Sequence, residues 1–142
     1  MRQHQLYAYG TLQLPEVLEQ VIGRRVESRH AVLDGYACYR LRNRVYPGIV
    51  ERSGERVTGV VYSGIDAHEI EQLDAYEGSF YERRTLTLRA DGGQIEALGY
   101  VLGSEHRGQL SKDAWDLEAF RREHLADYLK LVPHGYDKLE PK

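Results

Sequence analysis

The sequence predicts an α+β fold in which a small mixed or antiparallel β-barrel is flanked by helices. Segments with the two-residue hydrophobic alternation of strands outnumber segments with a helical period. Hairpin-type turns, rather than helices, separate most of these strands, which favours antiparallel pairing over a doubly wound parallel sheet. The length of 142 residues, with no linker-like segment, indicates one domain over residues 1–142.

The first predicted strand runs from Gln5 to Tyr9 and ends at Gly10. Apolar residues then recur at helical spacing from Leu14 to Ile22. Pro15 suits the first turn of this helix and Gly23 suits its end. The sequence therefore opens with a strand, a tight loop and a helix.

The next segments, 31–41 and 45–50, again alternate like strands. Ser53-Gly54-Glu55 is typical of a turn, and residues 57–62 alternate once more. We therefore expect a three-stranded antiparallel unit here.

A short helix is predicted to begin after Asp66, which is a good N-cap with Glu69 three residues later. Ile65 and Ile70 occupy the two positions of a hydrophobic staple. The helix should end between Tyr76 and Gly78, because glycine adopts the left-handed conformation that closes helices.

Residues 81–89 and 94–102 alternate on either side of Asp91-Gly92-Gly93, which strongly predicts a hairpin. A last helix is expected from about 113 to 131, followed by Pro133 and Gly135. We expect it to pack against the barrel, or to close one side of a pocket.

Composition limits the functional class. Apolar residues make up 42% and charged residues 29% of the chain, as in globular proteins, and the formal net charge is −3. This charge provides no general attraction to nucleic acid or anionic lipid, and Arg40, Arg42 and Arg44 are interpreted as a solvated strand end and turn. No secretion signal or membrane span is visible, and the single cysteine, Cys38, cannot form an internal disulfide. These features favour a cytoplasmic protein that binds neither nucleic acid nor membranes, and they leave its oligomeric state open.

The loop Tyr9-Gly10-Thr11-Leu12 is the first candidate for chemistry. A loop between a strand and a helix exposes backbone N–H groups, and its glycine allows a ligand to approach them closely. An ordinary strand-to-helix turn is the alternative interpretation.

Glu77 is the second candidate, because it lies near the end of a predicted helix. The negative end of the helix dipole and the neighbouring Tyr76, Phe80 and Tyr81 would disfavour its charged form and raise its pKa. Acid–base catalysis at neutral pH requires such a carboxylate. The alternative is a solvated glutamate in a capping turn.

Taken in order, several short motifs within residues 5–103 resemble the gamma-glutamylcyclotransferase-like family, the superfamily that includes the plant avirulence-induced proteins. They are Tyr9-Gly10-Thr11-Leu12, Tyr46-Pro47-Gly48, Gly59 to Tyr62, Leu73-Asp74-x-Tyr76-Glu77-Gly78-x-x-Tyr81-x-Arg83, and Ala97 to Tyr100. The resemblance implies a small barrel whose cavity holds a gamma-glutamyl group.

The same resemblance implies that Tyr9, Gly10, Thr11 and Leu12 bind the glutamyl end of the substrate and that Glu77 transfers protons. Tyr81 and Tyr100 are weaker candidates for the pocket wall, with core aromatics as the alternative. The implied reaction is attack of the substrate's α-amine on its own γ-carbonyl, which releases 5-oxoproline and an amine without a cofactor. Gamma-glutamylamines or a gamma-glutamylated biosynthetic intermediate are alternative substrates, and a non-catalytic ligand-binding module or a scaffold with an incidental cavity are alternatives of other classes.

Other reactive side chains are set aside. Cys38 lies in an apolar strand context with no histidine near it in sequence, so a buried thiol is expected. The six histidines lack metal-ligand spacing, so we expect no metal site. Asp74 and Glu82 flank the proposed catalyst, and the resemblance selects Glu77 over both.

Overall fold

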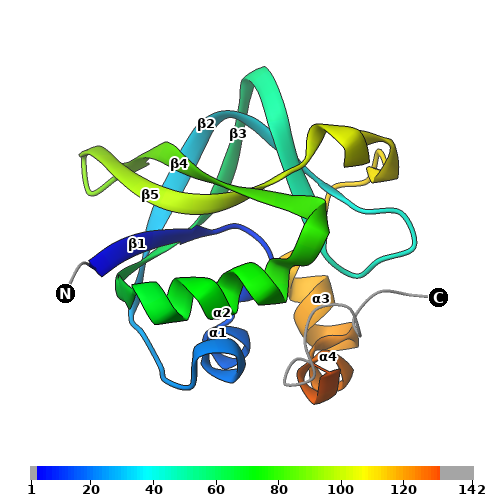
Figure 1. The fold of residues 1–142 in the computed structure, drawn as a ribbon. Helices are drawn as coiled ribbons and strands as arrows, with labels where there is room; N and C mark the ends of the chain where they lie inside the picture. The colour runs from blue at the N-terminus through cyan, green and yellow to red at the C-terminus, as the bar shows by residue number, and fades with distance from the viewer. Residues whose placement is uncertain (1–2, 132–142) are drawn as a thin grey trace.

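A computed structural model describes residues 3–131, and in this range the strands close into a mixed barrel (Figure 1). Around the ring, β1 is followed by β3, β2, β4 and β5. β1 and β5 pair in parallel, with Leu6 opposite Leu98, whereas the other neighbours are antiparallel. The predicted mixed barrel is confirmed. The strands are β1 Gln3–Ala8, β2 Ser28–Arg40, β3 Pro47–Asp66, β4 Tyr81–Ala90 and β5 Gly93–Leu102.

Helices cover the barrel on the side of β1, where α2 lies along the strand and α1 lies beyond it (Figure 1). They are α1 Pro15–Ile22, α2 Ala67–Glu77, α3 Leu117–Glu123 and α4 Leu125–Leu131, with short 3-10 turns η1 Thr11–Gln13, η2 Gly78–Phe80 and η3 Ser104–Gln109. Each of the helices α1 to α4 contributes residues to one apolar cluster against the barrel wall.

The alternation of β1 places apolar groups on both of its faces. Leu6 and Ala8 belong to the cluster beneath the helices, whereas Tyr7 and Tyr9 belong to a second cluster formed by strand residues. Because successive side chains of a strand point to opposite faces, a single short strand serves both clusters. β1 is thus buried on both sides just before the loop that follows it.

The predicted ends of the first two helices are confirmed in position, although Gly78, with φ 73° and ψ −160°, does not adopt the left-handed helical conformation expected of it. Pro15 occupies the first turn of α1, and Gly23 closes that helix with a φ of 87°. At α2, Asp66 Oδ1 accepts from the Glu69 N–H at 2.8 Å and Glu69 Oε1 accepts from the Asp66 N–H at 3.0 Å, which is a complete capping box. α2 ends at Glu77, before Gly78.

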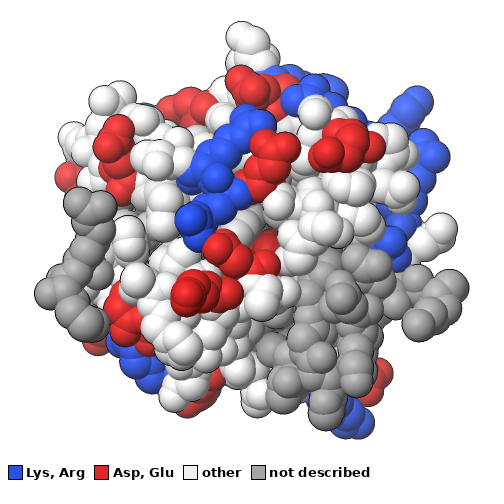
Figure 2. Space-filling view, viewed as in Figure 1, with Lys and Arg blue, Asp and Glu red and all other residues white. Residues whose placement is uncertain are grey.

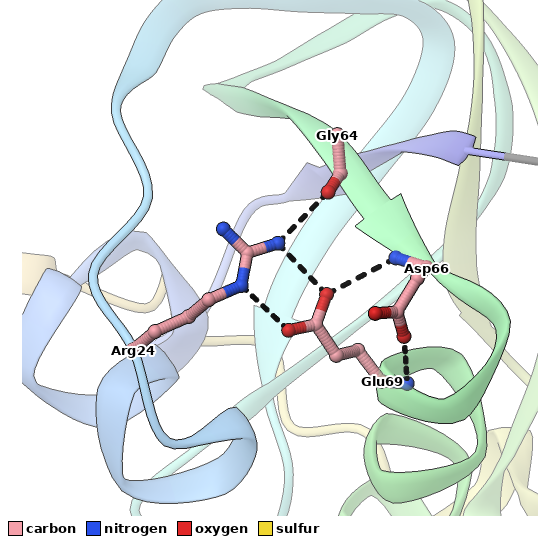
Figure 3. A network of polar contacts seen from close by, with 4 residues as sticks. All are labelled: Arg24, Gly64, Asp66 and Glu69. Carbon is pink, nitrogen blue, oxygen red and sulfur yellow. Dashed lines mark hydrogen bonds and ion pairs between the residues drawn. The ribbon is translucent and has the colours of Figure 1, made fainter. Parts of the chain in front are cut away.

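Arg24, in the connection that follows α1, binds the first turn of α2 (Figure 3). Its guanidinium donates to both carboxylate oxygens of Glu69, at 2.6 and 2.8 Å, and to the Gly64 carbonyl at 2.8 Å. Glu69 is buried, and hydrogen bonds from Arg24 are the main reason why its pKa is lowered. The connection after α1, the end of β3 and the first turn of α2 are therefore fixed together.

The predicted turn at Ser53-Gly54-Glu55 is wrong, because β3 continues through it and pairs with β2 on both sides of it. The register shifts there: Asp34 lies opposite Arg56, but Tyr36 lies opposite Glu51. Gly54 adopts a φ of 87°, so the chain forms a bulge that bends the strand without reversing it. The expected three-stranded unit is instead a long two-stranded ribbon.

The hairpin of β4 and β5 is confirmed, with Ala90 opposite Gly93. Asp91 and Gly92 both have positive φ, 52° and 79°, as in a type I′ turn.

The last helix differs from the prediction. The chain before it pairs with the end of β2, where the Arg42 N–H donates to Gln109 O at 2.6 Å and the Arg40 N–H donates to Asp113 O at 3.0 Å. The helix therefore begins only after its N-cap, Asp116. It is also interrupted at His124, which has a φ of −129°. Pro133 and Gly135 lie outside the described residues.

Figure 2 shows a band of Lys and Arg side chains bordered by Asp and Glu on one face of the molecule. On β4, Arg84 contacts Glu82 and Glu51, and Arg89 pairs with Asp34. Among the helices of residues 3–131, none combines the length and the apolar character that crossing a membrane requires.

Candidate functional site

A tyrosine-rich pocket opens where β1 leaves the barrel. The cavity itself has a volume of about 30 Å³, and it lies within about 400 Å³ of space between atoms that includes open solvent. Each residue that the sequence nominated as a site residue lines this pocket, although these residues come from four separate segments of the chain. The lining consists of Tyr7, Ala8, Tyr9, Gly10, Thr11, Leu12, Tyr46, Pro47, Tyr76, Glu77, Tyr81, Tyr100 and Tyr128.

The loop after β1 is held by hydrogen bonds to its carbonyl groups. The Tyr62 hydroxyl donates to Leu12 O at 2.6 Å, and Gln13 Nε2 donates to Tyr9 O at 2.6 Å. The first bond of η1 runs from the Gln13 N–H to Gly10 O, so the N–H groups of Thr11 and Leu12 precede it and have no partner within the turn. The carbonyl groups of Tyr9, Gly10 and Leu12 are thus occupied, whereas the N–H groups of Thr11 and Leu12 are not bonded within the turn.

Gly10 packs closely against the start of β3. A Cβ at this position would lie 3.0 Å from two ring atoms of Pro47. Pro47 begins β3 and also lines the pocket. The absence of a side chain at Gly10 thus lets the loop approach the opposite wall.

Glu77 is the last residue of α2 and the acidic residue of the pocket lining. The residue as a whole is half-buried, but its carboxyl group lies among the lining side chains. Burial, followed by the negative charge of Asp74, raises its pKa to about 8. The expected direction of the shift is confirmed, with desolvation as its main cause.

Asp74 lies behind the pocket wall and is held by two donors. The Tyr100 hydroxyl donates to Asp74 Oδ1 at 2.7 Å, and Arg83 Nη1 donates to Asp74 Oδ2 at 2.5 Å. One carboxylate therefore links α2 to both strands of the β4–β5 hairpin. Its negative charge remains close enough to Glu77 to affect that group's pKa.

The two weaker candidates, Tyr81 and Tyr100, both line the pocket, and both hydroxyls have protein partners. The Tyr81 hydroxyl donates to Pro47 O at 2.6 Å, and Tyr100 bonds Asp74 as described. The Tyr9 hydroxyl likewise donates to Tyr100 O at 2.7 Å. These three rings form the wall, and their hydroxyl protons are used within the protein.

Sequence reasoning did not assign several lining residues to the site. Tyr46, Pro47 and Tyr76 belong to the motifs that carry the family resemblance, which was the available signal for them. Tyr7 follows the alternation of β1 into the barrel interior. Tyr128 had no local signal as a site residue, because only the packing of α4 brings it to the pocket.

The side chains that were set aside lie outside the pocket lining. Burial raises the pKa of the Cys38 thiol to about 12. Glu82 points away and pairs with Arg84. Within residues 3–131, no three His, Cys, Asp or Glu side chains form a group that could hold a metal ion.

Comparison with known proteins identifies the family. The model of the family "Gamma-glutamyl cyclotransferase, AIG2-like" matches residues 6–117. AIG2-like protein C of Arabidopsis thaliana is 34% identical over 130 residues, covering 89% of this chain and 74% of that protein. AIG2-like protein A of the same plant is 31% identical over 128 residues, covering 89% and 78%.

Solved structures agree with the sequence match. A solution structure of an Arabidopsis thaliana protein superposes with a TM-score of 0.72 at 27% identity and covers 92% of this chain and 79% of that one. A structure described as gamma-glutamyl cyclotransferase shares the fold, with a TM-score of 0.63 at 14% identity over 99% of this chain and 90% of that one. The chain therefore belongs to the gamma-glutamyl cyclotransferase, AIG2-like family, which includes enzymes.

Proposed function

We propose that this protein is a gamma-glutamylcyclotransferase in which Glu77 transfers the protons. The observation that carries the proposal is a carboxyl group with a pKa of about 8 in a pocket next to a loop that presents backbone donors. A group that titrates close to neutral pH can both accept and return a proton during one turnover. Family membership supports the same reaction class.

In the proposed complex, the substrate's α-amino group lies against Glu77. At pH 7 about one tenth of a group with this pKa is ionised. A bound α-ammonium would favour the charged form of Glu77, because opposite charges at short range stabilise each other. Glu77 then removes a proton from the ammonium and frees the amine for attack.

The ring closes when the amine nitrogen attacks the γ-carbonyl carbon of the same glutamyl unit. Attack within one molecule has a large effective molarity once the chain is folded back. The N–H groups of Thr11 and Leu12 are available to stabilise the developing oxyanion. Collapse breaks the bond to the leaving nitrogen as Glu77 returns the proton to that nitrogen. The ring nitrogen then loses its second proton to the freed amine, and the products are 5-oxoproline and the amine as an ammonium ion.

The direct test is 5-oxoproline release from a panel of gamma-glutamyl amino acids, gamma-glutamylamines and larger gamma-glutamylated amines. Release from any member supports the proposal, and the preferred leaving group defines the substrate class. A folded protein that releases 5-oxoproline from none of them would overturn it. Tight binding of a panel member without turnover would support a ligand-binding module instead.

A further inference from the structure

Three hydroxyl groups meet on the pocket wall, each from a different element. Thr11 Oγ1 in the loop lies 2.7 Å from the Tyr76 hydroxyl on α2 and 3.5 Å from the Tyr128 hydroxyl on α4. The two tyrosine hydroxyls also hydrogen-bond to each other. All three residues are at most 6% exposed, and all three line the pocket. We call this group the hydroxyl cluster.

Tyr128 is the unexpected member, because it lies beyond residues 6–117, which the family model matches. Its ring packs edge-on against Phe120 at 5.1 Å between centroids, and Phe120 is itself 2% exposed. The Tyr76 ring also packs edge-on against Tyr128, at 6.5 Å. Packing against two aromatic rings therefore holds Tyr128 at the pocket.

The charge of the pocket lining limits what can bind a substrate anion. Among residues 3–131, the lining includes Glu77 but no Lys, Arg or His. The α-carbon of a free gamma-glutamyl group carries an ammonium and a carboxylate, and the proposed reaction places the ammonium at Glu77. Within the described part of the chain, the groups at hand for the carboxylate are therefore neutral donors.

Hydroxyl groups can supply these donors without a backbone change. Each hydroxyl proton rotates about its C–O bond, so a hydroxyl that bonds a neighbour can turn to an incoming anion. Hydrogen bonds to an ionised acceptor are shorter and about twice as strong as neutral ones. Tyr76, a member of the cluster, directly precedes Glu77 in the chain, which suits a ligand whose two charged groups share one carbon atom.

We propose that Tyr128, Thr11 and Tyr76 form a subsite for the α-carboxylate of the gamma-glutamyl group, with Tyr128 as a specificity-determining residue. This inference rests on the proposed function. It assigns the carboxylate to the hydroxyl cluster, and it leaves the N–H groups of the loop for the oxyanion.

The test compares a gamma-glutamyl substrate with its α-carboxamide analogue, in which the charge is removed. We expect the unmodified protein to prefer the carboxylate. In Tyr128→Phe this preference, measured as the ratio of the two kcat/KM values, should fall roughly 10-fold, mainly through KM, as expected for loss of one hydrogen bond to a charged group. The matched control is Tyr39→Phe, because the Tyr39 hydroxyl lies outside the pocket lining and accepts from Arg52 Nη1 at 3.1 Å, and its preference should not change.

A Tyr128→Phe protein that is folded and keeps the full preference would overturn the subsite. Should that variant unfold, the pair Thr11→Ser and Thr11→Val tests the same cluster: the serine retains a hydroxyl and should keep the preference, whereas the valine should lose it. If Thr11→Ser and Thr11→Val preferred the carboxylate substrate over the carboxamide equally, the inference would be contradicted.

A second measurement distinguishes failure of the proposed function from failure of the subsite. If the unmodified protein releases no 5-oxoproline from either substrate, calorimetric binding of 5-oxoproline and of its carboxamide still tests the subsite. Tighter binding of the carboxylate that depends on Tyr128 supports it, and equal binding of both ligands contradicts it.

Discussion

Asp74 lies one helical turn before Glu77 on α2, and its negative charge adds to burial in raising the pKa of Glu77 to about 8. Asp74 itself is bound by Tyr100 and Arg83. The proton affinity of the proposed catalyst therefore depends on a carboxylate that does not line the pocket.

Asp74→Asn should move the acidic limb of the kcat/KM profile to lower pH. Removing a neighbouring negative charge favours the ionised form of Glu77 and lowers its pKa, while burial keeps the pKa above the ordinary value. Glu82→Gln is the matched control, because Glu82 is exposed on β4 and pairs with Arg84. An acidic limb that stays in place or moves to higher pH in Asp74→Asn would show that Asp74 does not act on Glu77.

Glu77→Gln should stabilise the fold at alkaline pH. The folded-state pKa of Glu77 lies above its unfolded value of 4.5, so the native state binds more protons between about pH 4.5 and 8, and its stability falls as pH rises through that window. The glutamine variant avoids this loss. Urea unfolding should show a gain on the order of 1–3 kcal/mol at pH 8 that disappears near pH 4. An equally stable variant at both pH values would mean that the carboxyl group is solvated.

Glu69→Gln should lower stability at neutral pH by about 1–2 kcal/mol, because it removes the charge that Arg24 binds at the start of α2. The pKa of Glu69 is lowered in the folded state, so its contribution is present above about pH 4.5 and is lost as pH falls below that value. The difference between the two proteins should shrink accordingly in acid.

The exposed pair Arg25–Glu19 provides the control for this experiment. Glu19→Gln should change the unfolding free energy by less than about 0.5 kcal/mol. If Glu69→Gln and Glu19→Gln changed the unfolding free energy equally, the buried Glu69 carboxylate would contribute no more to stability than an exposed one.

Gly59→Ala should destabilise the protein by roughly 1–3 kcal/mol, because a Cβ there would lie 2.3 Å from the Ala8 carbonyl oxygen, which belongs to the strand leading into the loop. Thermal unfolding measures the effect. Gly93→Ala is the control, since a Cβ at Gly93 meets nothing within 4 Å. A tolerated Gly59→Ala would indicate that β1 can move away from β3.

Features set by neighbouring residues were predictable from the sequence. The capping box of Asp66 and Glu69, the left-handed Gly23 and the turn at Asp91-Gly92 each depend on a few adjacent positions. The loop and Glu77 were nominated from their local context and from the order of the family's motifs. Both line one pocket in the structure.

Features set by distant partners were not predictable. Gly54 has the composition of a hairpin turn, but pairing of β3 with β2 on both sides of it makes a bulge instead. The start of the last helix is delayed because residues 109–113 bond to the end of β2. Tyr128 reaches the pocket only through packing against Phe120 and Tyr76. In each case the deciding contact joins segments that are far apart in the sequence or depends on tertiary packing.

Glu77 is proposed to transfer the proton in a pocket that binds the gamma-glutamyl group. This role is tested by pairing the rate of 5-oxoproline release with calorimetric binding of the same substrate, for the unmodified protein and for Glu77→Gln. The variant should lose turnover by at least about 100-fold, as expected when a general acid–base is removed, while its affinity changes little. A variant that keeps full turnover would contradict the role of Glu77.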